Sequence, residues 1–190
     1  PETGTASVLG IKKLYAEEPS MLTTGMKFNE AIKTLSAGGS LIQSVQVVDT
    51  RPSDGTPTSD VSANNDGSYV VWWDADTKTI KLYSKSGNVI LNPDSSDMFY
   101  DCGSLTTLDA SNWDTSHVTN MHGMFLYCFA LSTLNASNWD TSQVMDMSNM
   151  FEDCSSLATL DVSNWNTSQV TNMKNMFLDC NKLTTQDVSN

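Results

Sequence analysis

Residues 124–149 read MFLYCFALSTLNASNWDTSQVMDMSN, and closely similar units recur without gaps every 26 residues. Full copies span 98–123, 124–149 and 150–175, and a partial copy spans 176–190. Every copy opens with Met-Phe, places a cysteine four residues after that methionine and a leucine three residues after the cysteine. A fixed period of this length is typical of proteins whose repeats stack on one another. The sequence therefore predicts stacked units of about one turn of chain each.

The apolar repeat positions predict the core of this stack. Leu105 and Leu108 suit a short strand whose side chains point alternately inward and outward, and stacking pairs such strands into a parallel sheet at ~4.8 Å spacing. Val118, Met121 and Met124 are three residues apart, which predicts a helical or 3₁₀ turn on the opposite side. One unit alone cannot bury these side chains, so neighbouring units must stack.

Polar side chains flank the strand leucines and are expected on the outward face of the sheet. They recur as Thr107, Asp109 and Ser111; Thr133, Asn135 and Ser137; and Thr159, Asp161 and Ser163. Stacked carboxylates could bind a cation, but the glycine-rich loops of calcium-binding repeats are missing. We therefore expect no metal and no cofactor. The outward sheet is the best candidate ligand-binding face, and a solvated polar ladder is the alternative.

The cysteine and tryptophan rows each leave two interpretations open. Neighbouring units would bring equivalent cysteines about 5 Å apart, within reach of a disulfide, whereas buried free thiols are the commoner use of such positions. The four cysteines are Cys102, Cys128, Cys154 and Cys180, and their spacing fits no zinc site. Trp113, Trp139 and Trp165 suit either core packing or a sugar-stacking surface.

The composition excludes several classes of function. The 190 residues carry a net charge of −12 with only ten Lys and Arg, so the chain lacks the basic clusters that nucleic-acid binding needs. No apolar run approaches the ~20 residues of a membrane helix, so no membrane insertion is expected. Hydrophobic residues make up 39% of the chain, enough for a packed core.

The residues upstream of the repeats predict an N-terminal cap. Residues 1–27 are predicted to be a tail or linker. A helix is expected next, because Phe28, Ala31, Ile32 and Leu35 would share one of its faces. After the helix the sequence predicts a strand at 41–48, a loop at 51–67, and a hairpin of strands 69–73 and 79–83. A shift of 26 residues maps Leu82 onto Leu108, so the second hairpin strand is expected to act as a degenerate first unit. Residues 28–97 would then form an α+β cap, which the exposed end of a repeat array requires.

The unit Met124–Val144 closely resembles the BspA-like leucine-rich repeats of bacterial surface proteins, with their pattern MFxxCxxLxxLDxSN[FW]DTSxVxxM. The resemblance covers residues 98–190, and Asn166, Met145 and Gln186 depart from the pattern. It implies a right-handed leucine-rich-repeat solenoid with a parallel sheet on one face. It also implies a secreted or cell-surface bacterial protein, and some members are adhesins toward host or bacterial partners.

Three functions follow as hypotheses. The first is an extracellular binding or adhesion module with a protein or glycan ligand, and the second is a structural stalk without its own ligand. The third, a glycan-processing enzyme, has the least support. His117 and His122 have no equivalents in the sister repeats that could serve as catalytic partners. No nucleophile or metalloprotease motif occurs either, so we expect a non-enzymatic protein.

Overall fold

The computed structural model describes residues 19–184 and has an α+β fold. Its elements are α1 (Gly25–Leu35), β1 (Ser44–Val48), β2 (Thr58–Asp60), β3 (Tyr69–Asp74), β4 (Thr79–Ser84), β5 (Val89–Ile90), β6 (Thr107–Asp109), β7 (Trp113–Asp114) and β8 (Thr133–Asn135). Within these residues there is no helix with the length and apolarity that a bilayer crossing requires.

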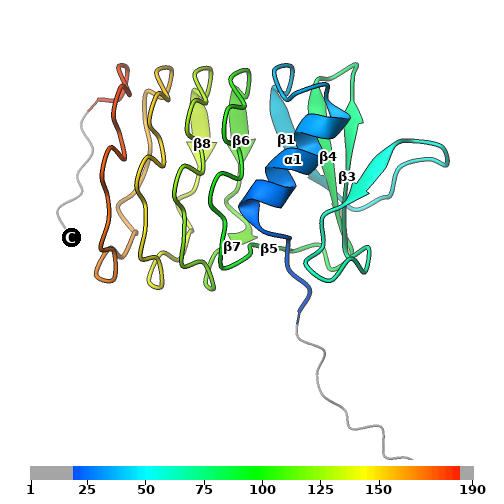
Figure 1. The fold of residues 1–190 in the computed structure, drawn as a ribbon, viewed down its shortest axis with the longest axis horizontal. Helices are drawn as coiled ribbons and strands as arrows, with labels where there is room; N and C mark the ends of the chain where they lie inside the picture. Colours follow the sequence, from blue (N-terminus) through cyan, green and yellow to red (C-terminus); the bar gives the residue numbers. More distant parts are fainter. Residues whose placement is uncertain (1–18, 185–190) are drawn as a thin grey trace, which may run out of the picture.

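Six strands form one open sheet in the order β2-β3-β4-β1-β6-β8, and β5 pairs with β7 in a second, two-stranded sheet (Figure 1). The pairs β2–β3 and β3–β4 are antiparallel, and the remaining pairs are parallel. The predicted hairpin and helix are both confirmed. Phe28 and Ile32 of α1 are fully buried, because their spacing of four places them on one helix face.

Strand β1 lies next to the first repeat strand, and this corrects the expectation that the second hairpin strand would do so. β1 is inserted between β4 and β6, parallel to both, with Ser44 opposite Thr107. On the other side of the core, β5 pairs with β7, so residues 89–97 continue the stack there. The unit before the first repeat is therefore built from two separate segments, which a simple shift of 26 residues cannot detect.

Two further boundaries differ from the sequence-based expectation. The expected loop at 51–67 contains β2, a short polar strand that pairs with β3 at the sheet edge and has no apolar alternation to reveal it. The packed structure also begins before residue 28, since Leu22 is only 1% exposed and its N–H donates to the carbonyl of Ile90. Residues 1–18 of the expected tail, and 185–190 of the last repeat, lie outside the described residues.

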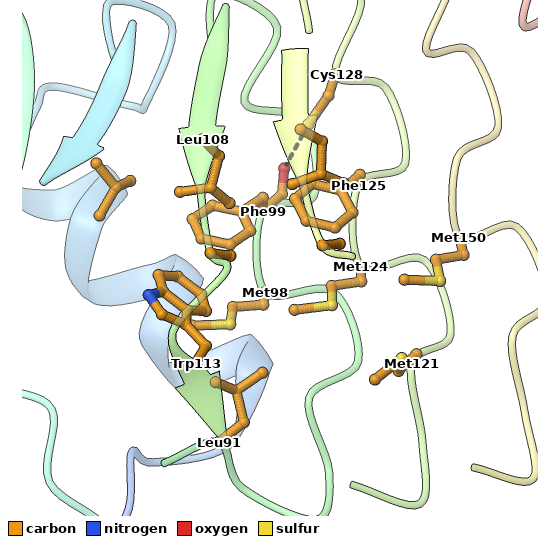
Figure 2. Close-up of a cluster of buried hydrophobic side chains, with 14 of the residues drawn as sticks. Leu91, Met98, Phe99, Leu108, Trp113, Met121, Met124, Phe125, Cys128 and Met150 are labelled. Atoms are coloured by element: carbon orange, nitrogen blue, oxygen red, sulfur yellow. Dashed lines mark hydrogen bonds between the residues drawn. The ribbon is translucent and has the colours of Figure 1, made fainter. Parts of the chain in front are cut away.

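Equivalent residues of successive repeats lie side by side, as the row from green to red in Figure 1 shows. Phe99, Phe125, Phe151 and Phe177 form a continuous stack with ring centroids 5.3–5.5 Å apart. Figure 2 shows the first two of these rings and the row of Met98, Met124 and Met150 beside them. The inward assignment of the repeat Leu, Met, Phe and Cys side chains is confirmed over most of the stack. Met173, in the last described repeat, is 40% exposed.

A helical turn is expected around Met121 and Met124, but the peptide groups of this segment form hydrogen bonds to the neighbouring repeats. Each such segment contains four of these peptide groups. Where the first repeat runs into the second, these groups join residues 120–121, 122–123, 124–125 and 126–127. All four point their C=O at the preceding repeat and their N–H at the following one. Met124 accepts from the N–H of Phe99 (2.9 Å), and the N–H of Phe125 donates to Met150 (2.9 Å). We call this array the peptide ladder. No continuous helix forms here, but isolated turns do, since the N–H of Met124 donates to the carbonyl of Met121 and that of Leu126 to the carbonyl of Gly123. The predicted helical or 3₁₀ turn is therefore confirmed only as single turns.

The peptide ladder contains recurring residues with left-handed backbone conformation. These residues have φ between 56° and 64°, and they are Asp97, Asp101, Gly123, Tyr127, Asn149, Asp153, Asn175 and Asp179. Gly, Asn and Asp adopt this region at the lowest cost, which explains their recurrence at these positions. Tyr127 is the exception, a bulky side chain where its three sister repeats have Asp.

The tryptophan row is part of the core, so the packing interpretation is confirmed and a sugar-stacking surface is not. Trp113, Trp139 and Trp165 are 4%, 2% and 3% exposed. The indole N–H of Trp139 donates to the carbonyl of Ala110 (3.0 Å), and that of Trp165 to Ala136 (3.3 Å). Trp113 has no such acceptor within the described residues, because β1 replaces the preceding repeat there.

This difference predicts unequal effects of two matched substitutions. Trp139→Phe is expected to cost about 1 kcal/mol more unfolding free energy than Trp113→Phe, since both reduce packing but only the first removes a buried hydrogen bond. Urea unfolding of the two variants, followed by the fluorescence of the remaining tryptophans, measures the difference. Equal losses in the two variants would contradict the assignment.

Candidate functional site

The outward row consists of the nine polar residues that flank the strand leucines, and all nine are accessible to solvent. Thr107 and Asp109 of β6 lie opposite Thr133 and Asn135 of β8, and all four are exposed. Ser111 and Ser137 are half-buried. In the third repeat, Thr159, Asp161 and Ser163 are exposed, although residues 159–161 form no strand. The structure thus brings the predicted residues together in adjacent columns on one face.

The aspartates of the outward row also form the turns that follow the strands. The Oδ1 atom of Asp109 accepts a hydrogen bond from the N–H of Ser111 (3.2 Å), and that of Asp161 accepts from the N–H of Ser163 (3.0 Å). Hydrogen bonds from the hydroxyl and N–H of each serine lower the pKa of each aspartate. Both carboxylates are therefore ionised at neutral pH, and each uses one oxygen for the turn.

A hollow of about 280 Å³ opens beside the first of these turns. Asp109, Ser111 and Trp113 of the first repeat line it together with Gln46 and Val47 of β1. Val47 is 36% exposed. The hollow combines apolar walls with a few polar groups, as ligand sites commonly do. It lies where the outward row meets the cap.

The β1 residues of this hollow were not among the predicted site residues. Gln46 and Val47 precede Asp109 and Ser111 by more than 60 positions along the chain. Their place in the site depends on β1 pairing with β6, and the repeat pattern contains no signal for that pairing.

The four cysteines are free thiols, which resolves the alternative that the sequence left open. The Sγ of Cys128, Cys154 and Cys180 each donates to the carbonyl of a phenylalanine in the preceding repeat, at 3.2, 3.2 and 3.0 Å. Figure 2 shows the first of these bonds, from Cys128 to Phe99. Burial raises the pKa of Cys102 to about 12 and that of Cys180 to about 11. These thiols are protonated at neutral pH and are unsuited to nucleophilic chemistry.

The described residues also contain no cluster of three His, Cys, Asp or Glu side chains able to hold a metal ion. His122 Nδ1 lies 2.8 Å from the hydroxyl of Ser148, whose Oγ in turn donates to Asp146 (2.5 Å). The N–H of Ser148 bonds to the same Asp146 oxygen at 2.8 Å, which makes this a turn like those of the outward row. We assign it a structural role between neighbouring repeats.

Comparison with known proteins identifies the family of the repeat region. Neither the curated proteins nor the solved structures contain a match to this chain. Residues 93–190 match the family described as "Mycoplasma protein of unknown function, DUF285". The match begins at the end of the cap and includes all of the repeats. Because it spans half of the chain, the protein belongs to the DUF285 family.

Proposed function

We propose that this protein is a non-enzymatic binding module of the bacterial cell surface or of secreted proteins. In this proposal its repeats form a BspA-like leucine-rich-repeat solenoid, and the outward row contacts a protein or glycan ligand. The observation that carries the proposal is the in-register placement of identical or similar polar side chains on one accessible face, such as Thr107 beside Thr133 and Asp109 beside Asn135. A repeated array of equivalent groups suits an extended ligand, which can bind several columns at once.

Two other features support a binding role. The hollow beside Asp109 supplies a recessed point on this surface, and a ligand could be anchored there. The core behind the row is built from stacked, fully buried side chains such as Phe125 and Leu131, so the row is held on a rigid support. Sites on rigid elements lose less conformational entropy when a ligand binds.

The double substitution Asp109→Asn and Asp161→Asn tests this proposal. An asparagine oxygen can still accept the turn hydrogen bond, as Asn135 does in the sister repeat, where the hydroxyl of Ser137 lies 3.2 Å from its Oδ1. The variant should therefore keep its stability within about 0.5 kcal/mol. We expect it to lose at least about tenfold in affinity for any ligand that the wild-type chain binds saturably in a panel of extracellular proteins and oligosaccharides.

Asp140→Asn is the matched control, because Asp140 forms the same kind of turn with Ser142 but lies outside the outward row. Equal affinity of the double variant and the wild type would refute the outward row as the ligand site. The absence of saturable binding across the panel would favour a structural stalk, and turnover of a polysaccharide would favour the enzymatic alternative.

A further inference from the structure

Three aromatic side chains break the repeat pattern and meet on the surface. Tyr100, Tyr127 and Phe129, here named the aromatic cluster, have ring centroids 5.8 and 5.9 Å apart in that order. Tyr100 is 38% exposed and Phe129 is 45% exposed. Leu, Glu and Leu stand at the equivalents of Tyr100, Asp at all three equivalents of Tyr127, and Gly, Ser and Asn at those of Phe129. The stack does not need aromatic residues at these positions.

The local backbone accommodates this cluster at a cost. Tyr127 has φ 64°, a region that its sister aspartates adopt more readily. In the first repeat, Gly103 leaves room for the neighbouring ring, since a Cβ at this position would lie 3.3 Å from Cδ2 of Phe129. Strained residues that a fold does not require are concentrated at functional sites. Exposed neighbouring aromatics are likewise enriched at the centres of protein interfaces.

The charges around the cluster indicate the chemistry of its partner. Along the column of the peptide ladder, Tyr127 lies between Asp101 and Asp153. Lys33 of the cap pairs with Asp101, since its Nζ lies 3.6 Å from that carboxylate. The same Nζ lies 5.0 Å from the centroid of the Tyr100 ring. Asp153 has no Lys or Arg partner within the described part of the chain. The ring of Tyr127 and the carboxylate of Asp153 are therefore available to bind a second cation.

We infer that the aromatic cluster, with Asp153, is a docking surface for a basic segment of a partner protein. An arginine or lysine of that segment stacks on Tyr127 or Phe129 and pairs with Asp153, as Lys33 does with Tyr100 and Asp101 in the first repeat. The net charge of −12 favours approach of such a segment. This inference names a partner chemistry for the proposed binding role and rests on that role, but it uses a different surface from the outward row.

The test replaces the cluster with the residues of its sister repeats. The double variant Tyr127→Asp and Phe129→Ser gives the second repeat the residues of the third at both positions. Its thermal midpoint should be unchanged or raised, because Asp relieves the left-handed strain. The probe is an arginine–glycine octapeptide, titrated into the ¹⁵N-labelled full chain and followed by the amide shifts of Tyr100, Tyr127 and Asp153.

The wild type should show saturable shifts confined to this surface, and the double variant should bind at least about tenfold more weakly. The variant adds a negative charge, so purely electrostatic binding would become tighter instead, and that result would overturn the inference. Asp153→Asn should weaken binding and reduce its dependence on salt. A glutamate–glycine octapeptide is the charge control.

The remaining outcomes separate this inference from the proposed function. Saturable shifts at the aromatic cluster with chitotetraose, and none with the arginine peptide, would assign the surface to glycans and overturn the basic-segment partner. No saturable shift with the arginine peptide would also overturn it. Peptide binding that is lost in the Asp109→Asn and Asp161→Asn variant, but kept in the cluster variant, would overturn this surface while leaving the binding role intact.

Discussion

Between pH 7 and pH 10 the protein is expected to lose about 6 kcal/mol of unfolding free energy because of three buried thiols. Burial raises the pKa of Cys102 to about 12, and it raises the pKa values of Cys128 and Cys154 well above their usual range. In the unfolded chain each thiol ionises near pH 8.5. Above that pH the unfolded state binds fewer protons than the folded state, so stability falls as the pH rises.

The size of this loss in unfolding free energy depends only on the thiol pKa in the unfolded chain, as long as the thiols of the folded protein stay protonated. Each thiol then contributes about 2 kcal/mol at pH 10, and near that pH the three together give a slope of about 4 kcal/mol per pH unit. Domains of this size are stable by about 5–15 kcal/mol, so the loss is large enough to unfold the protein. Below about pH 7 the thiols should contribute almost no pH dependence, because they stay protonated in the unfolded chain as well.

Urea unfolding at a series of pH values between 7 and 10, with a reductant present, measures this loss. The Cys128→Ala variant should release one proton fewer on unfolding. This should reduce the slope by about one quarter, since Cys180, with its pKa raised to about 11, contributes beside the three buried thiols. Cys180→Ala should reduce the slope by nearly as much, because burial raises the pKa of Cys180 to about 11 and its thiol is still largely protonated in the folded state at pH 10. A free energy of unfolding that stays constant from pH 8.5 to pH 10 would contradict the buried, protonated state of these thiols.

The interior of the repeats could be predicted from the sequence because a residue that recurs every 26 positions must occupy the same place in every unit. This argument correctly placed Leu105, Met124 and Phe125 inside and the outward row on the surface. It did not give the backbone conformation between Val118 and Cys128. Spacings of three suit a helical turn, but a series of tight turns brings the same side chains to one side. The recurring Asp, Asn and Gly of the peptide ladder were the missed signal.

The cap was less predictable because its pairings are distant in the sequence. β1 pairs with β4 about 35 residues later and with β6 about 60 residues later, and no local pattern specifies either neighbour. Part of the hollow beside Asp109 is lined by this strand, so only the part that the repeats supply could be predicted from the sequence. The aromatic cluster was visible as departures from the repeat, but its convergence required the structure.

Replacing Asn29 is expected to destabilise the protein by about 3 kcal/mol, because its side chain closes one end of the peptide ladder. All ladder carbonyls point toward the cap, and those of the first repeat have no earlier repeat to bond. The Nδ2 of Asn29, which is 6% exposed, donates to the carbonyls of Met98 (3.3 Å) and Tyr100 (3.0 Å). Asn29→Leu keeps the approximate volume but removes both hydrogen bonds.

Gly25, Asn29 and Lys33 are spaced by four residues and therefore share the face of α1 that meets the peptide ladder. The N–H of Gly25 donates to the carbonyl of Asp94 (2.9 Å). A Cβ on Gly25 would lie 2.2 Å from the carbonyl oxygen of Ser96, so only glycine allows this approach. The ladder's aligned peptide dipoles place partial negative charge at this end, as at a helix C-terminus, and Lys33 lies on the same side. Asn29 is thus the central member of a helix face that is complementary to the ladder.

Asn29→Asp separates this capping role from simple packing. At neutral pH the introduced carboxylate would face two carbonyl oxygens without a proton to donate, so the loss should exceed that of Asn29→Leu. At pH 4 the protonated carboxyl can donate one hydrogen bond, and part of the stability should return relative to wild type. Glu30→Gln, at the exposed neighbouring position, is the control and should change stability by less than about 0.5 kcal/mol. A loss below about 1 kcal/mol for Asn29→Leu, together with a pH-independent Asn29→Asp variant, would mean that water satisfies the carbonyls of Met98 and Tyr100 equally well.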